Sequence, residues 1–448
     1  MRDKLQHMHP IVKKVQDAGV VGAGGAGFPA HLKYNTNAEI VLANGAECEP
    51  LLYKDKELMR LFPNEVKKGM ELVAKAVSAS RSILGVKSKN KDVIGQFRGL
   101  FGGTKHEIFE MGDYYPAGDE YVLIYEAVGR LVPYGGYPIH IGCVVSNVET
   151  LLNVALADSG VPVTETFLTV NGVIKNPMTI KVPIGTPLNE IIEFAGGLTT
   201  SEPVAALAGG AMMGQLQTDF TLPVTKTSAG FIFVPMDHTL VRRRSESLSE
   251  MKKIGQSACD QCTYCTEFCP RYLLGYHIEP HKVMRSLGFA GEKDDFWGNY
   301  AVNCCECNLC SLYACPEDLD PKQACVRSKK NIKLKGLSYT PPETELAAHP
   351  MQEHRKVSIH KLTRKLGLLP YNQKADFHLD RFIPTHVNIP LSQHIGVPAT
   401  PIVNEGSEVS IGQMIGQIPD GEMGAHVHAS INGLVKSVTN DNIMIEAK

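Results

Sequence analysis

The chain of 448 residues lacks both a strong net charge and a long apolar run. Its 45 Lys and Arg stand against 47 Asp and Glu, so the strong positive field of a nucleic-acid-binding protein is absent. No stretch reaches the roughly eighteen apolar residues of a membrane-spanning helix, and residues 1–10 lack the apolar core of a signal peptide. We therefore expect a soluble, cytoplasmic protein with no transmembrane segment, whose partners are small molecules or proteins and not nucleic acid.

Cysteine, in contrast, is plentiful, with 12 residues in the chain. A disulfide scaffold is excluded, because that pattern belongs to short secreted chains. Eight of the cysteines fall into two ordered runs, one within residues 259–270 and one within residues 304–316. We expect the remaining four to be reduced thiols: Cys48, Cys143, Cys305 and Cys325.

Each run has three cysteines at steps of three, followed by a fourth cysteine directly before a proline. This is the bacterial ferredoxin pattern, in which the fourth cysteine of one run ligates the cluster of the other run. The predicted first [4Fe-4S] centre is held by Cys259, Cys262, Cys265 and Cys315. The predicted second [4Fe-4S] centre is held by Cys269, Cys304, Cys307 and Cys310.

Structural zinc is the alternative for these cysteines, because paired C-x-x-C elements also bind zinc. A zinc site needs neither the third cysteine at the same step nor the repeated Cys-Pro, so the spacing favours iron and sulfide. The second run departs from the pattern, since four residues separate Cys310 from Cys315. Cys305 is too close to Cys307 to take the first step in place of Cys304, and we expect it not to be a ligand.

A glycine-rich segment, residues 19–33, follows an apolar stripe that predicts a helix over residues 4–19. Dense glycines let backbone amides approach a phosphate or a flat ring. A Rossmann site and a plain structural loop remain alternatives, although a clear preceding strand and the later ribose-binding acid are missing. The segment alone is therefore a weak indication of a nucleotide site.

Three further segments accompany the glycine segment: residues 44–50 (Asn-Gly-Ala-Glu-Cys-Glu-Pro), 114–120 (Tyr-Tyr-Pro-Ala-Gly-Asp-Glu) and 144–150 (Val-Val-Ser-Asn-Val-Glu-Thr). Together the four resemble the flavin and NADH domain shared by the flavoprotein subunit of respiratory complex I and the RnfC family. The resemblance implies that the glycine loop and its lysine cradle FMN and the nucleotide, and that the Asn-Val-Glu-Thr segment helps to hold the FMN phosphate. It places the following residues at the site: Gly22, Gly24, Gly25, Gly27, Phe28, Lys33, Asn44, Glu47, Glu49, Gly118, Asp119, Glu120, Asn147 and Thr150.

The chemistry of these side chains suits that assignment. Phe28 is suited to stack on an adenine or nicotinamide ring, and Lys33 to neutralise a phosphate. Asn147 offers a neutral donor to phosphate oxygens. Glu49 and Glu120 are acceptors for ribose hydroxyls, with a solvated loop charge as the alternative for either residue alone. The sequence does not indicate a catalytic residue.

The rest of the chain predicts a multidomain α/β protein. We expect the FMN/NADH domain over residues 1–160 and an SLBB-like β-grasp domain over 161–240, with a hairpin that reverses at Asn171-Gly172. An α-helical two-cluster ferredoxin-like domain follows over 241–338, then a linker over 339–382. Residues 383–448 resemble a lipoyl-like barrel-sandwich hybrid domain without an exposed lysine hairpin, which favours a docking or structural role. Its alternating His426 and His428 suit either a metal or a barrel turn.

The order of these parts predicts a converter of paired electrons into single ones, with NADH as donor and the one-electron acceptor near the second centre. Nearly the whole chain resembles the PduS cobalamin reductases of bacterial propanediol-utilisation microcompartments. The resemblance implies reduction of cob(III)alamin through cob(II)alamin to cob(I)alamin, in a homo-oligomer inside a microcompartment beside an adenosyltransferase and shell proteins. An RnfC-like subunit that delivers electrons to ferredoxin is one alternative, and a cluster-bearing scaffold that does not oxidise NADH is another.

Overall fold

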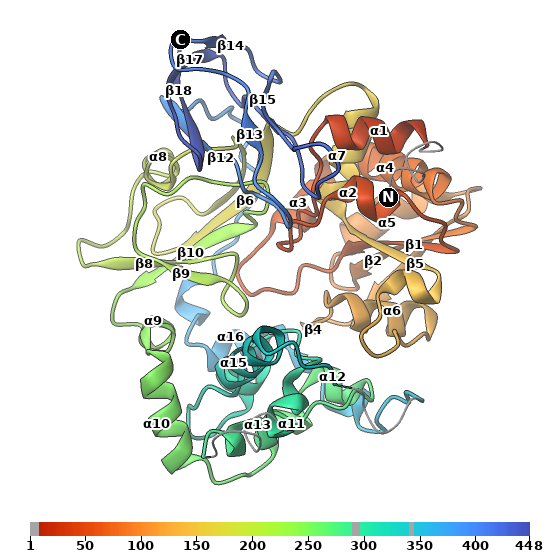
Figure 1. The fold of residues 1–448 in the computed structure, drawn as a ribbon, viewed down its shortest axis with the longest axis vertical. Helices are drawn as coiled ribbons and strands as arrows, with labels where there is room; N and C mark the ends of the chain where they lie inside the picture. The colour runs from red at the N-terminus through yellow and green to blue at the C-terminus, as the bar shows by residue number, and fades with distance from the viewer. Residues whose placement is uncertain (1–8, 289–295, 340–344) are drawn as a thin grey trace.

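The computed structural model describes residues 9–288, 296–339 and 345–448. The units follow one another along the chain in the predicted order. The first unit (red to orange) lies beside the β-grasp unit (yellow to green), the iron–sulfur unit (green to teal) lies below them in Figure 1, and the barrel (blue) lies above. The predicted multidomain α/β architecture is confirmed.

A parallel sheet in the order β3-β2-β1-β5 forms the centre of the first unit. Its strands are β1 (Ile40–Gly45), β2 (Arg81–Lys87), β3 (His106–Met111) and β5 (Cys143–Asn147). β1 is apolar on both faces because both are covered by helices. Val41 packs with residues of α4 and α7 on one face, and Leu42 packs with α6 on the other.

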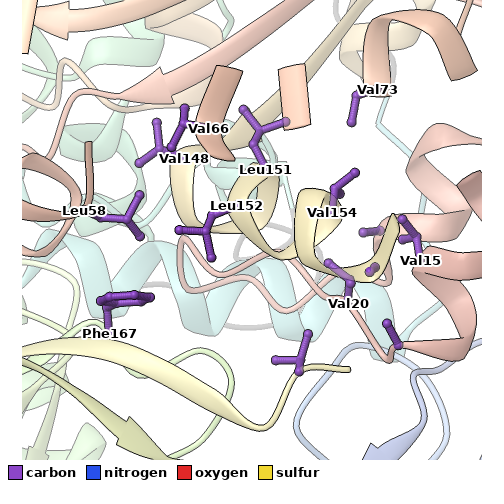
Figure 2. Close-up of a cluster of buried hydrophobic side chains, with 14 of the residues drawn as sticks. Val15, Val20, Leu58, Val66, Val73, Val148, Leu151, Leu152, Val154 and Phe167 are labelled. Atoms are coloured by element: carbon purple, nitrogen blue, oxygen red, sulfur yellow. The ribbon is translucent and has the colours of Figure 1, made fainter. Parts of the chain in front are cut away.

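Helix α7 is the most buried helix of this unit. Figure 2 shows Val148, Leu151, Leu152 and Val154 of α7 surrounded by apolar side chains of neighbouring elements. The helices of the unit are α1 (Pro10–Asp17), α2 (Ala30–Tyr34), α3 (Lys54–Leu61), α4 (Pro63–Ala76), α5 (Lys91–Phe101), α6 (Glu120–Val128), η2 (Pro138–Ile141) and α7 (Val148–Asp158). The helix predicted over residues 4–19 begins at Pro10, while residues 1–8 of that prediction lie outside the described residues.

The β-grasp unit has one sheet in the order β7-β6-β10-β8-β9, with β6 parallel to β10 and the other neighbours antiparallel. Its elements are β6 (Glu165–Gly172), β7 (Met178–Pro183), α8 (Leu188–Phe194), β8 (Val204–Ala208), β9 (Gln215–Gln217) and β10 (Gly230–Pro235). The predicted reversal at Asn171-Gly172 is wrong, because both residues belong to β6 and the chain reverses after them. Gly172 is needed for close packing instead, since a Cβ there would lie 2.0 Å from the Phe233 carbonyl oxygen.

Short helices make up the iron–sulfur unit. They are α9 (Thr239–Ser245), α10 (Leu248–Ala258), α11 (Tyr264–Glu267), α12 (Pro270–Leu273), α13 (Pro280–Ser286), η3 (Asn299–Ala301), η4 (Cys310–Ala314) and α15 (Pro321–Leu334). The predicted linker after them is tied to the first unit. Within it, β11 (Val357–Ser358) pairs with β4 (Tyr114–Tyr115), and α16 (Ile359–Lys365) buries Leu362 in a shared core. The linker also contains η5 (Gln352–His354) and η6 (Leu369–Tyr371).

Two small antiparallel sheets form the barrel, β12-β18-β17-β14 and β13-β15-β16. Their strands are β12 (His386–Pro390), β13 (Thr400–Pro401), β14 (Glu408–Val409), β15 (Met414–Gln417), β16 (Val427–His428), β17 (Gly433–Val438) and β18 (Asn442–Ala447). Apolar residues of the barrel share a core with α1 and α7 of the first unit. The barrel is therefore packed against the N-terminal domain despite the distance between them in sequence.

A buried lysine marks the junction of the first, β-grasp and barrel units. Lys226, which is 3% exposed, donates from Nζ to the carbonyl oxygens of Gly19 and His426, each at 2.7 Å. Burial lowers the pKa of Lys226 to about 7. Nearby, the Ile395 N–H donates to the Gly27 carbonyl at 3.0 Å. These bonds attach both ends of the glycine segment to the other two units.

Candidate active site

The two cysteine runs adopt the same loop conformation. The residues before and after the middle cysteine have positive φ in both: Gln261 at 60° and Thr263 at 70° in the first run, Glu306 at 61° and Asn308 at 68° in the second. Cys304, Cys307 and Cys310 are therefore the counterparts of Cys259, Cys262 and Cys265. The Glu306 N–H also points to Cys304 Sγ at 3.4 Å. The conformation places Cys304, not Cys305, at the first ligand position.

A single turn of π-helix accommodates the extra residue of the second run. In η4 the Cys315 N–H donates to the Cys310 carbonyl five residues earlier, at 3.1 Å. In the first run the Cys269 N–H instead donates to Thr266, three residues earlier, at 2.9 Å. Because a π-turn takes up one more residue than an α-turn, the longer spacing still ends in a cysteine at the start of a Cys-Pro step.

The four cysteines predicted for the first centre line one pocket. They are Cys259, Cys262, Cys265 and Cys315. Cys315 reaches this pocket from the second run, as the exchange of fourth ligands requires. The Cys262 side chain is exposed, so this centre lies at the surface of the protein.

The cysteines predicted for the second centre form a more deeply buried group, in which Cys269, Cys307 and Cys310 are each 7% exposed. Burial raises the pKa of the Cys269 thiol. Cys305 and Cys325 lie in the same region, Cys305 beside Cys307 and Cys325 beside Cys304. No group of three metal-binding side chains among the described residues is arranged to hold a single metal ion.

The second centre lies against the first unit. The buried Tyr115 hydroxyl donates to the Cys307 carbonyl at 2.7 Å, and Cys269 packs in one apolar cluster with Ala46 and Ala117. Burial on this side corrects the expectation that the acceptor is met at the second centre. The exposed Cys262 places the outer end of the pair at the first centre instead.

The tip of the glycine segment is open and lies beside the start of α7. Residues 24–26 are exposed, and Gly25 has a φ of +108° with no atom within 4 Å of an added Cβ. The Ala23 N–H donates to Thr150 Oγ1 at 2.9 Å, and a Cβ on Gly24 would lie 3.4 Å from Asn147 Cβ. Exposed backbone amides next to a helix N-terminus are suited to a phosphate.

The base of the same segment faces protein. The Gly22 N–H donates to the carbonyl of half-buried Phe28 at 2.9 Å. Gly27 has a φ of +67°, and a Cβ there would lie 3.2 Å from both His394 Cα and Thr227 Cγ2. The contact predicted between Gly27 and a nucleotide is thus replaced by contacts with the barrel and β-grasp units.

Lys33 and Glu120 form an ion pair beside this tip. Lys33 Nζ lies 3.4 Å from Glu120 Oε1 and donates to the Val145 carbonyl at 2.8 Å. Both side chains are about a third exposed, at 35% and 36%. The lysine is thereby held two residues before Asn147, where it lies near the glycine tip.

Glu47 and Asn44 organise the segment after β1. The Glu47 carboxylate accepts the N–H groups of Asp55 (3.0 Å) and Lys56 (3.2 Å) in the first turn of α3. Burial and the neighbouring Asp55 raise the Glu47 pKa. Asn44 Nδ2 donates to the Gly118 carbonyl at 2.9 Å. Glu47 therefore caps a helix, and Asn44 connects two of the predicted segments.

Glu49 holds a loop of the β-grasp unit. Its two carboxylate oxygens accept the N–H groups of Met212 (2.8 Å) and Met213 (2.9 Å). Burial raises the Glu49 pKa to about 7. The ribose contact predicted for Glu49 is corrected accordingly, because both of its oxygens are engaged with backbone amides.

Asp119 and Asn147 are helix caps. Asp119 Oδ1 accepts the N–H groups of Tyr121 and Val122 at the start of α6. Asn147 Oδ1 accepts the Glu149 N–H at 2.9 Å at the start of α7, and its Nδ2 donates to Asp55 Oδ2 at 2.8 Å. Each cap also points its helix N-terminus toward the site.

The sequence reading missed a buried pair beneath the glycine tip. Lys54 and Glu149, 3% and 1% exposed, form an ion pair of 2.6 Å, and Lys54 also donates to the Ala23 carbonyl at 3.1 Å. The neighbouring Asp55 has a buried Oδ1 with no hydrogen-bond partner in the described part of the chain. The signal was present, since Lys54-Asp55 follows the segment that ends at Pro50 and Glu149 lies within the Asn147 segment.

These features fit a phosphate-bearing flavin. The glycine tip, the α7 N-terminus and Lys33 supply amides and a positive charge for a phosphate. The unpaired Asp55 Oδ1 supplies an acceptor for an N–H or O–H group. The donor set is thus in place for FMN, with the second centre on the opposite side of the Tyr114–Tyr115 strand.

Comparison with known families matches each unit. The Nuo51 FMN-binding domain matches residues 15–156, the SLBB domain 167–216, the 4Fe-4S dicluster domain 258–320 and the RnfC barrel sandwich hybrid domain 370–448. The chain is 37% identical to "Cobalamin reductase PduS" of Salmonella typhimurium over 97% of this chain and 96% of the relative. The protein belongs to the PduS-like and RnfC-like family of NADH oxidoreductases. Its FMN-binding and dicluster domains indicate FMN and two [4Fe-4S] clusters.

Other members of this family match over different lengths. "Cobalamin reductase PduS" of Citrobacter freundii is 36% identical over 98% of this chain and 97% of its own. The RnfC-type component of the proton-translocating ferredoxin:NAD(+) oxidoreductase complex of Clostridium ljungdahlii is 32% identical over 62% of this chain and 58% of its own. An NAD+-reducing [NiFe]-hydrogenase shares the fold at a TM-score of 0.50 and 18% identity, over 77% of this chain and 70% of that chain. The described helices include none with the length and apolarity of a membrane span.

Proposed function

We propose that this protein uses NADH to reduce cob(III)alamin through cob(II)alamin to cob(I)alamin. The observation that carries the proposal is the match to two cobalamin reductases over nearly the whole length of both chains. The structure supports it with a continuous arrangement from the glycine tip to the second centre and on to the exposed Cys262. When bound, FMN would accept the two electrons of a hydride and the clusters would carry them singly.

The residues of the chain have separate tasks in this activity. Lys33 and the glycine tip hold phosphate, while Asn147 and Thr150 hold the tip against α7. Glu47 and Asn44 fix the segment that lines the flavin in the family. The cysteines of the second centre are buried between the units, where solvent is excluded.

An anaerobic assay of reconstituted protein tests the proposal. Protein loaded with FMN, iron and sulfide is mixed with NADH and cob(III)alamin, and the cobalamin absorbance is followed. We expect conversion to cob(II)alamin, and loss of the activity in Cys310→Ser but not in the matched thiol variant Cys143→Ser. Cys143 lies in β5, outside both cysteine runs. No change in cobalamin absorbance with fully loaded protein would refute the proposal.

A second candidate acceptor is ferredoxin, which appears in the name of the Clostridium ljungdahlii relative. The same loaded protein with ferredoxin in place of cobalamin separates the two: faster reduction of ferredoxin favours the RnfC-like role. A cluster-bearing scaffold would show iron–sulfur absorption that NADH leaves unchanged.

The proposal extends to the setting in which the protein acts. From its likeness to the PduS relatives, we place it in a bacterial propanediol-utilisation microcompartment, as a homo-oligomer beside an adenosyltransferase and shell proteins. Co-purification with shell proteins from microcompartment preparations tests the location, and recovery only in the fraction free of shell proteins would contradict it.

A further inference from the structure

Arg271 connects the first unit to the second centre. It lies in α12, two residues after Cys269, and is 8% exposed. Its Nη2 donates to Asp119 Oδ2 at 2.9 Å, and the guanidinium lies 3.6 Å from the centre of the Tyr121 ring. The backbone N–H of Arg271 also donates to the Cys269 thiol. One buried cation therefore contacts both a flavin-side carboxylate and a ligand of the second centre.

The other N–H groups of this guanidinium lie among the cysteines. Nε and Nη1 are buried and have no well-formed hydrogen bond to any described residue. The Cys305 thiol interacts with the guanidinium, and Cys305 itself neighbours Cys269 and Cys307. Unpaired buried donors are costly, so sulfur atoms at this position would satisfy them.

We propose that Arg271 is a positioning residue that sets the potential at which the second centre accepts an electron. A fixed positive charge beside an iron–sulfur cluster favours the more negative, reduced form, and hydrogen bonds to its sulfur atoms act in the same direction. The effect is strong because the site is buried. Asp119 opposes it by placing a negative charge on the far side of the guanidinium. The proposal rests on the cluster assignment given above.

A potentiometric titration followed by electron paramagnetic resonance tests this role. Fully loaded protein is titrated with dithionite and mediators, without NADH or cobalamin. We expect Arg271→Met to lower the ratio of reduced to oxidised second centre at least tenfold at a fixed potential, which corresponds to about 59 mV for one electron. Asp119→Asn keeps the side-chain oxygen that caps α6 but removes the opposing charge, so it shifts the same ratio in the opposite direction.

Two further variants separate charge from packing. Arg271→Lys keeps the charge and loses the planar stack on Tyr121, so it stays closer to the unchanged protein than Arg271→Met. Arg243→Gln is the matched control, because Arg243 lies beside Cys315 of the first centre and donates to the Ser311 carbonyl at 2.8 Å. It shifts the signal of the first centre more than that of the second.

Shifts of the same sign in Arg271→Met and Asp119→Asn would overturn the proposal, as would an unchanged second centre in either variant. If Arg271→Met does not assemble both clusters, the direction of the shift in Asp119→Asn decides. Because neither NADH nor cobalamin is present, failure of the reductase activity with opposite shifts intact would reject only the proposed substrates.

Discussion

The Lys54–Glu149 pair offers a direct test of what holds the flavin cradle together. Burial alone lowers the Lys54 pKa, but the attraction of Glu149 and Asp55 outweighs it and raises that pKa. Removing one partner of a buried pair costs about 3–5 kcal/mol, because the other charge is left without compensation. In Lys54→Met, Glu149 keeps its bonds from Thr166 Oγ1 (2.9 Å) and the Phe167 N–H (3.0 Å). We therefore expect a cost near the lower end, about 3 kcal/mol.

Hydrogen exchange in α7 measures this cost locally, which matters because a chain of several domains need not unfold in one step. A loss of about 3 kcal/mol lowers the protection of residues 148–158 about a hundredfold, since each 1.4 kcal/mol is a factor of ten. Unfolding followed by tryptophan fluorescence would miss the effect, because the chain has 1 Trp and it lies at position 297, in the iron–sulfur unit.

Matched variants decide whether the pair is the cause. Glu149→Gln is expected to have a similar effect, and the double variant Lys54→Met with Glu149→Met to cost less than the sum of the single changes, because the two side chains interact. Lys91→Met is the control, since its pair with Glu110 is exposed and worth less than about 1 kcal/mol. A change below tenfold in both single variants, or simple additivity, would refute the reasoning.

Three further outcomes are expected. Cys304→Ser loses the iron and sulfide of the second centre while Cys305→Ser keeps them, as measured by metal and sulfide content; the reverse result would move the ligand to Cys305. Lys226→Met raises the FMN dissociation constant about tenfold, equivalent to one hydrogen bond to a charged group, because the glycine segment loses a bond at Gly19; unchanged FMN affinity would contradict this. The raised Glu49 pKa means that the folded protein retains a proton between about pH 4.3 and pH 7, so stability falls as pH rises through this window. Thermal unfolding at pH 5 and pH 8 is expected to show a smaller difference in Glu49→Gln, and an equal difference would exclude Glu49 as the source.

Local spacing was enough to predict the architecture and the paired cysteine runs. The steps between Cys259, Cys262 and Cys265 define a loop by themselves, and the π-turn at Cys310 shows how an altered spacing preserves it. Asn171-Gly172 misled because the same dipeptide that favours a reversal also allows the close approach of a neighbouring strand.

Contacts between distant residues account for what the sequence did not reveal. Arg271 and Asp119 are 152 positions apart, so no local pattern indicates that they meet. Glu49 lies within a flavin-lining motif of the family, yet its carboxylate binds amides 163 and 164 positions further along the chain. Residue type alone predicted an acceptor in each case and did not identify the donor.

The attachment of the glycine segment to the last domain has a consequence for biosynthesis. Gly27 bonds to Ile395, and Gly19 shares Lys226 with His426. A ribosome must therefore release almost the entire polypeptide before these supports exist. Chains that end early are left with an unsupported phosphate loop, so retention of the yellow cofactor reports that translation reached the C-terminal barrel.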